Sequence, residues 1–284
     1  GYHIAKEGWT EMSGEKPENN SMFEYGSTGL GANSDRRQIS EEEISEYTIA
    51  SYLGDWDPSA DINKLKSLVE KNVVDLNRND DQAECDYDMI VDSAFEGNDV
   101  DSKYGVSTYK SIQAAIDTIS SKNASEKKIL IKAGRYYEKL NIEKPNVTLI
   151  GEDPENTVIT YDVASGSIMK PEHGGDGVMT YGTSKSASVV VAYKAVNFNA
   201  VNITFENSFD ESLPIQSKQA VALRNEADKS TFVNCRFIGD QDTLLVNKNV
   251  TQHYYRCYIE GDVDFIFGSA TAVFEECELF SSNR

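Results

Sequence analysis

Two aspartates in the last third of the chain are spaced so that they could act together. Asp242 and Asp264 lie 22 residues apart in CRFIGDQDTLLVNKNVTQHYYRCYIEGDVDFIFG (235–268), and Cys235 and Cys257 repeat the same interval. A period in this range indicates a chain that stacks similar units. Because neighbouring strands of a sheet lie roughly 4.8 Å apart, we expect the two carboxylates one above the other on successive coils.

Such a pair has a definite chemistry. Two stacked carboxylates cannot both ionise freely, so one pKa should rise, which suits an ionised nucleophile beside a protonated partner. Gln241 and Gln219, also 22 apart, could donate side-chain N–H groups to an oxyanion. The set predicts acyl transfer at an ester. A regular strand would turn Gln241 and Asp242 to opposite sides, so we expect a bend, which Gly239 and Gly261 favour.

Stacked aspartates also have a simpler interpretation, since Asp and Asn often satisfy backbone N–H groups in the turns of a solenoid. Periodicity alone leaves both interpretations open.

The elements around the pair predict an all-β solenoid. From residue 127 onward, short runs rich in β-branched and aromatic residues alternate with polar breaks, which favours a parallel β-helix. Residues 108–122 predict an amphipathic helix that caps its N-terminal end. Residues 162–182 read as a loop that overhangs a groove. Near the N-terminus, residues 40–53 and 62–76 predict helices, with Ser40 as an N-cap.

Composition and net charge argue against several classes of binding partner. The 284 residues carry a net charge of −20, which argues against nucleic acid and anionic membranes as partners. No apolar run reaches membrane length. Cys235, Cys257 and Cys277 predict a stacked column of small buried side chains rather than metal ligands, and no cofactor is expected.

Five segments carry a resemblance to a known family. They are GRYYEKL (134–140), GTSKSAS (182–188), QAVAL (219–223), QDTL (241–244) and DFIFG (264–268). In type, order and spacing they resemble the motifs of the pectinesterases, right-handed parallel β-helix enzymes that hydrolyse the methyl esters of homogalacturonan (pectin) to pectate and methanol.

The resemblance implies a role for each matching residue. Asp264 would be the nucleophile, Asp242 the general acid and then base, and Gln241 and Gln219 the oxyanion donors. Substrate contacts would come from Thr183, Gln219, Val263 and Phe267. Two other classes remain open: a β-helix polysaccharide hydrolase or lyase, and a non-catalytic pectin-binding module.

The resemblance also bears on the domains. The family's L-G-R-P-W motif, which supplies an arginine beside the nucleophile, is absent, and residues 1–57 resemble the region that follows it, including Trp9. We therefore expect three parts: a tail of a preceding pectinesterase domain (1–60), a helical, acidic linker (61–86) and a C-terminally truncated catalytic domain (87–284). The parent would be a monomeric tandem-domain chain, secreted or at the cell surface because its substrate is a polymer.

Overall fold

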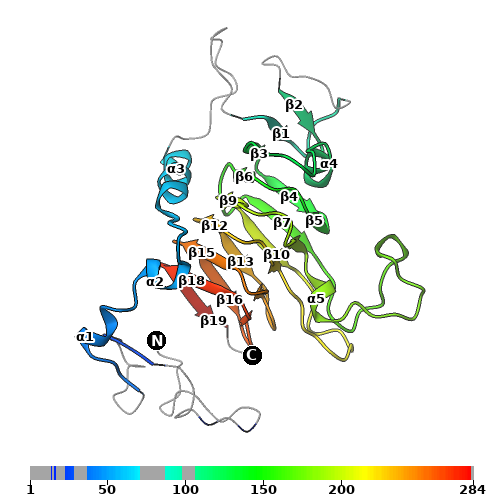
Figure 1. The fold of residues 1–284 in the computed structure, drawn as a ribbon. Coiled ribbons are helices and arrows are strands. Elements are labelled where there is room, and N and C mark those ends of the chain that lie inside the picture. Colours follow the sequence, from blue (N-terminus) through cyan, green and yellow to red (C-terminus); the bar gives the residue numbers. More distant parts are fainter. Residues whose placement is uncertain are drawn as a thin grey trace. The chain divides into compact units, whose positions relative to one another are not determined.

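The computed structural model describes residues 14, 16, 23–28, 37–70, 87–97 and 106–282 (Figure 1). The chain divides into two compact units, Gly1–Asp57 and Pro58–Arg284. Trp9 and residues 71–86 lie outside the described residues. The division of the chain into a tail, a linker and a catalytic domain stays a prediction.

The described residues of the second unit form three parallel sheets. The first sheet holds β1 (Met89–Val91), β2 (Ser107–Tyr109), β3 (Lys127–Ile131), β6 (Val147–Gly151), β9 (Asn199–Val201), β12 (Ser230–Val233), β15 (Thr251–Tyr255) and β18 (Thr271–Glu275). The second holds β4 (Gly134–Tyr137), β7 (Thr157–Tyr161), β10 (Thr204–Asn207), β13 (Arg236–Ile238), β16 (Tyr258–Gly261) and β19 (Glu278–Ser281). The third holds β5 (Leu140–Ile142), β8 (Val189–Val191), β11 (Leu223–Asn225), β14 (Leu244–Val246) and β17 (Ile266–Gly268).

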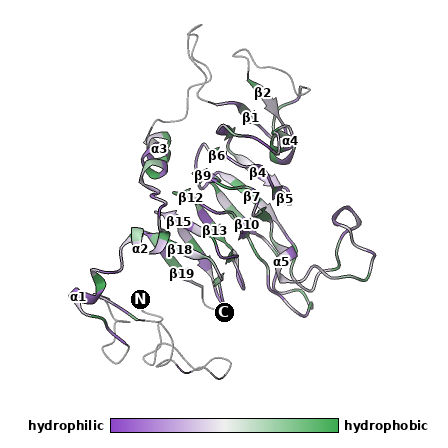
Figure 2. Cartoon of the chain, viewed as in Figure 1, coloured by the Kyte–Doolittle hydropathy of each residue, from purple (hydrophilic) through white to green (hydrophobic). Residues whose placement is uncertain are grey.

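From β3 onward, successive strands belong to the first, second and third sheets in turn, and each coil stacks on the one before it. The prediction of a right-handed parallel β-helix is confirmed. The register also follows the sequence period, because Phe237 pairs with Ile259 and Leu244 with Ile266. Hydrophobic and hydrophilic residues are interleaved along the strands (Figure 2), as expected when alternate side chains face the inside of the solenoid.

The core of the solenoid is a stack of aromatic rings with a column of cysteines beside it. The ring of Tyr254 lies 4.9 Å from that of Phe232 and 4.8 Å from that of Phe274, in both cases nearly parallel. Cys235 and Cys257 are buried, and the backbone N–H of Cys257 donates to Sγ of Cys277 at 3.4 Å. The predicted cysteine column is therefore present, and these three thiols are free.

Corners between the first and second sheets use the left-handed backbone region. Asn202, Asn234, Arg256 and Glu276 each follow a strand of the first sheet and have φ between 51° and 57°. Asparagine tolerates this region better than most residues. The Asn234 amide donates to Oδ1 of Asn202 at 2.7 Å, which ties one corner to the next.

Helices differ in detail from the prediction. In the first unit, residues 40–53 form two helices, α1 (Glu41–Ile44) and α2 (Ile49–Leu53), because Ser40 and Thr48 each close a capping box. In the second unit, α4 (Ile112–Asp117) is shorter than predicted, since residues 107–109 join β1 as β2 and Ser111 is the N-cap.

The helix α3 (Ser59–Glu70) packs on the outer face of the first sheet. Ile62, Leu65 and Leu68 form one buried cluster with side chains of that sheet, among them Val201 and Val233. This part of the expected linker is thus a packed helix. None of the helices in the described ranges has the length and apolar character that a bilayer crossing requires.

Residues 162–182, predicted as a loop, leave the solenoid between β7 and β8. They contain the short helix η2 (Pro171–His173) and an isolated bridge between Ile168 and Thr180. The helix α5 (Thr183–Ser186) follows and leads the chain back into β8.

Candidate active site

The two aspartates lie in matching turns that join the second sheet to the third. Asp242 stands between β13 and β14, and Asp264 stands one coil further on, between β16 and β17. Their backbones have φ of 67° and 48°, in the left-handed region. The chain therefore bends at each aspartate, and the alternation of a regular strand, which would separate Gln241 from Asp242, does not apply there.

A run of backbone hydrogen bonds fixes the turns against one another. The bonds are Gly182 N–H to Ser165 O (2.8 Å), Ser165 N–H to Gln219 O (2.7 Å), Ala220 N–H to Gln241 O (3.0 Å) and Asp242 N–H to Val263 O (2.9 Å). In this register Gln219 lies next to Gln241, and Asp242 next to Asp264. The residues predicted from the 22-residue period are thus brought into one row.

The 22-residue interval between stacked residues of neighbouring coils holds only as far as the start of β11. Ala222 and Leu223 both donate their N–H to Thr243 O, at 2.8 and 3.3 Å. Two residues thus oppose one, as in a β-bulge, and the interval falls from 22 to 21 at the pair of Leu223 and Leu244.

Asp242 is the buried member of the pair. The residue is 7 % exposed, and its carboxylate accepts no hydrogen bond from the described part of the chain. Burial, together with the charges of Asp264 and Asp262, raises its pKa from 3.8 to about 6, with burial as the largest cause. A buried carboxylate without a partner costs free energy, so its presence indicates a functional group rather than a turn-stabilising one.

Asp264 is exposed, on the turn that leads into the edge strand of the third sheet. The two glutamines lie beside the pair, both half-buried. Oε1 of Gln219 is buried and has no hydrogen-bond partner within the described residues. The side chain of Gln241 likewise makes no hydrogen bond to the described chain, so both amides remain available to a ligand.

A threonine that the sequence analysis did not single out holds the turn of Asp242. The hydroxyl of Thr243 lies 3.0 Å from the carbonyl oxygens of both Asp240 and Glu260, so it can donate to either. The turn is also tightly packed, because a Cβ on Gly261 would lie 2.5 Å from Thr243 Oγ1. The only sequence signal for Thr243 is its place next to Asp242 in QDTL.

The residues expected to contact substrate surround this row. Thr183 is the first residue of α5 and is half-buried, and its carbonyl accepts from the Ser186 hydroxyl at 2.7 Å. Val263 is 42 % exposed between the two aspartate turns. Phe267 packs on the outer face of the third sheet, against the cluster of Ala187, Val221 and Leu245, rather than inside the solenoid.

Comparison with known proteins identifies the family of the chain. The Pectinesterase family model matches residues 98–284, which include every residue of the site. The chain belongs to the pectinesterase family. It is 34 % identical to the pectinesterase of Ralstonia solanacearum, over 90 % of this chain and 64 % of that protein. It is 40 % identical to Pectinesterase 31 of Arabidopsis thaliana, over 64 % of this chain and 56 % of that one.

Solved pectinesterase structures share the fold. Pectin methylesterase PemA from Erwinia chrysanthemi superposes with a TM-score of 0.60 and 32 % identity, over 71 % of this chain and 57 % of that one. A pectin methylesterase in complex with a hexasaccharide superposes with a TM-score of 0.59 over the same shares. This pectinesterase chain spans about half the length of most of the curated relatives that it matches, with shares of 56, 44 and 42 % in three of them.

Proposed function

We propose that this pectinesterase chain hydrolyses the methyl esters of homogalacturonan to pectate and methanol, with Asp264 as nucleophile and Asp242 as acid and base. The observation that carries the proposal is the pairing of unlike environments in adjacent turns. Asp242 is buried with a pKa of about 6, whereas Asp264 is exposed where a polymer can reach it. Two carboxylates with separated roles are what covalent ester hydrolysis needs.

In the first step, an Asp264 oxygen attacks the carbonyl carbon of the C6 methyl ester, and the carbonyl oxygen becomes an oxyanion. The bond to the methoxy oxygen then breaks, and protonated Asp242 gives its proton to the leaving methanol. The product of this step is an anhydride between Asp264 and the galacturonate. The raised pKa of Asp242 keeps a proton available at mildly acidic pH.

In the second step, ionised Asp242 takes a proton from water, and the hydroxide attacks the acyl carbon of the anhydride. The bond to Asp264 breaks, which frees the galacturonate carboxylate and restores the nucleophile. Asp242 keeps the proton that it took from water, and the other proton of that water passes from the product acid to solvent, so the pair ends the cycle as it began.

The oxyanion of both steps would be held by the side-chain N–H groups of Gln241 and Gln219. Their placement on adjacent coils and their lack of partners in the described chain support this role. Thr183, Val263 and Phe267 would contact the sugar chain around the reacting ester.

We further propose that the protein acts outside the cell, because polymeric pectin cannot cross a membrane intact. A tandem parent in which this chain joins the tail of one pectinesterase domain to the body of the next accounts for the order of its motifs. In such a parent Trp9 belongs to the preceding domain.

The decisive assay separates an esterase from the other two classes. Purified protein is incubated with highly methylated pectin, and methanol, chain length and unsaturated products are measured together. The proposal predicts methanol release while the chain length stays constant. A fall in chain length or unsaturated ends without methanol would instead indicate a hydrolase or a lyase, and binding without any product would indicate a pectin-binding module.

A further inference from the structure

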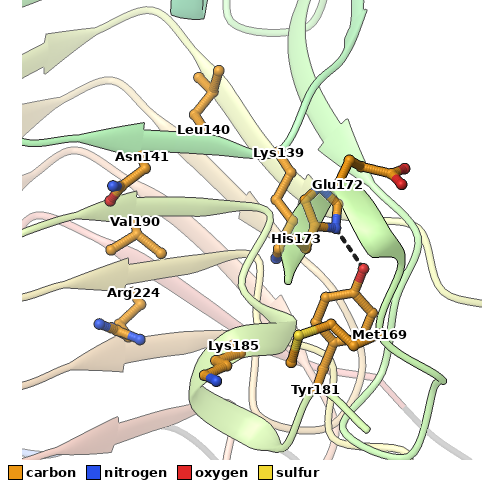
Figure 3. A pocket seen from close by; sticks show the side chains of 10 residues that line it. All are labelled: Lys139, Leu140, Asn141, Met169, Glu172, His173, Tyr181, Lys185, Val190 and Arg224. Carbon is orange, nitrogen blue, oxygen red and sulfur yellow. Dashed lines mark hydrogen bonds between the residues drawn. The ribbon is translucent and has the colours of Figure 1, made fainter. Parts of the chain in front are cut away.

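The loop 162–182 is folded on itself and, together with α5, forms one wall of a pocket of about 530 Å³ (Figure 3). Within the loop, the backbone N–H of Tyr181 donates to the carbonyl of Ser167 at 3.1 Å. Nδ1 of His173 lies 2.6 Å from the hydroxyl of Tyr181. Because these contacts hold the loop together, its position depends on how its base is fixed to the solenoid.

One buried amide lies at that base. Asn207 ends β10 and is 4 % exposed, and its Nδ2 donates to the carbonyls of Val163 at 3.0 Å and Ser186 at 3.3 Å. Val163 stands where the loop leaves the solenoid, and Ser186 stands where α5 leads the chain back to β8. The same Nδ2 donates to the carbonyl of Val221 at 3.0 Å. A single side chain thus joins both ends of the loop to the segment that carries Gln219.

The orientation of the Asn207 amide is fixed by its other hydrogen bond. The backbone N–H of Phe209 donates to Oδ1 of Asn207 at 3.1 Å, so the NH₂ group faces the three carbonyls. Carbonyl oxygens accept hydrogen bonds and cannot donate them. A residue without an N–H donor at this position would therefore remove one shared donor from three carbonyls at once, which costs free energy in a buried place.

The hydroxyl of Ser186 adds two hydrogen bonds at the same place. It accepts from the backbone N–H of Val221 at 3.1 Å and donates to the carbonyl of Thr183 at 2.7 Å. Thr183 is expected to contact substrate, and Gln219 lies two residues before Val221. The backbones of both site residues are therefore held by hydrogen bonds that meet at Asn207 and Ser186.

The chemistry depends most on the position of Gln219. Its carbonyl accepts from the N–H of Ser165 at 2.7 Å, which ties it to the loop. Its side-chain Oε1 is buried without a partner among the described residues, so the place of the amide follows from the backbone that carries it. A displacement of about 1 Å at a catalytic group can cost about 10²-fold in rate.

We propose that Asn207 is a positioning residue of the esterase site, which holds the base of the loop 162–182 and the segment of Gln219 in one arrangement. The inference rests on the proposed function, in which Gln219 donates to the oxyanion. Because the oxyanion forms only along the reaction path, loss of the Asn207 amide lowers kcat more than it raises KM.

Asn225 offers a matched control at the next corner along the chain. It is also buried and ends a strand, β11, and its Oδ1 accepts from a backbone N–H two residues further on, as that of Asn207 does. Its amide donates instead to the hydroxyls of Ser230 at 2.8 Å and Tyr254 at 3.2 Å. Its loss should destabilise the solenoid without displacing Gln219.

Hydrogen exchange tests the proposed contact without catalysis. In Asn207→Ala, amide exchange in 163–188 and 219–223 should be at least about tenfold faster than in the unaltered chain, whereas Asn225→Ala should leave both segments unchanged. Ser186→Ala is a milder change that should speed exchange in 219–223, so the test holds even if Asn207→Ala does not fold. Exchange that stays unchanged in the folded variants overturns the proposal, whatever the methanol assay gives.

A double-mutant cycle on methanol release tests the link between Asn207 and Gln219. Asn207→Ala should lower kcat about 10²-fold in the unaltered chain but less than about threefold in a Gln219→Ala background, because the displaced donor is already gone. Asn225→Ala should change kcat less than about twofold in either background. Equal losses for Asn207→Ala in both backgrounds would overturn the positioning role.

The two measurements separate this proposal from the esterase assignment. An unaltered chain that releases no methanol contradicts the proposed function, and the exchange rates then decide by themselves whether Asn207 holds the segment of Gln219. Methanol release with unchanged exchange in Asn207→Ala keeps the esterase and overturns the role of Asn207.

Discussion

Asp242 lies directly above Asp264 in the solenoid, because its backbone N–H donates to the carbonyl of Val263 at 2.9 Å. Both aspartates have a positive φ, of 67° and 48°, yet one is buried and the other exposed. The two aspartates therefore differ in exposure although they occupy matching turns.

The pH dependence of the first chemical step should report on Asp242. The proposed acid must be protonated, and its pKa is about 6. We therefore expect kcat/KM for methyl-ester hydrolysis to fall about tenfold per pH unit above that value. A pH–rate profile on a soluble methylated oligogalacturonate measures this limb.

Asp262→Asn gives a control for that assignment. The charge of Asp262 contributes to the raised pKa of Asp242, so its removal should move the limb to lower pH. A limb that stays in place or moves upward would show that another group controls it.

Asp242 should also lower the stability of the protein at neutral pH. Below 3.8 both the folded and the unfolded chain hold the proton, and no cost arises. As the pH rises to about 6, the folded state binds more protons than the unfolded state, so stability falls and then stays reduced. Asp242→Asn should therefore raise the free energy of unfolding by about 1–3 kcal/mol at pH 7.

Urea denaturation at pH 7 and pH 4 measures this effect, and the gain should shrink at the lower pH. Asp55→Asn, which removes an exposed charge in the first unit, should change neither value by more than a few tenths of a kcal/mol. A stabilisation of Asp242→Asn that is equal at both pH values would contradict the raised pKa.

Thr243 should matter as a positioning residue. Thr243→Val removes the hydroxyl that lies between Asp240 O and Glu260 O, and we expect a loss of about 1–2 kcal/mol in unfolding free energy. Because the turn carries Asp242, kcat should fall more than KM rises. Thr243→Ser keeps the hydroxyl and should restore kcat.

Thr231→Val is the matched control for that substitution. Thr231 is also fully buried, but its Oγ1 has no hydrogen-bond partner within the described residues. Replacing it by an isosteric apolar residue should be neutral or stabilising. Equal losses at both threonines would indicate a packing effect rather than a hydrogen bond.

The stacked coils could be predicted because a parallel solenoid repeats its residue types in register. Leu244 lies on Ile266 in both the sequence period and the structure. Gly239 and Gly261 predict a bend near Asp242, but the left-handed conformation falls on the aspartates themselves. A period identifies which residues stack, but it does not identify which residue of each turn has positive φ.

Other features depend on contacts that no period records. The shift from 22 to 21 at Leu223 follows from a bulge in which two N–H groups share Thr243 O. Lys139 and Arg224 line one pocket although they are far apart in sequence, because the third sheet places β5 and β11 on either side of β8. The helical pattern of residues 40–53 does not reveal that Thr48 is a second N-cap, which divides the segment into two helices.

Methanol release by aspartate variants tests the central claim most directly. Initial rates on highly methylated pectin are compared for the unaltered protein, Asp264→Asn, Asp242→Asn and Asp262→Asn. The pH is about 5.5, at which most of an acid with a pKa of about 6 is protonated. The account predicts losses of about 10³-fold or more for Asp264→Asn and about 10²–10⁴-fold for Asp242→Asn, with most activity kept by Asp262→Asn. Substantial methanol release by Asp264→Asn would contradict it.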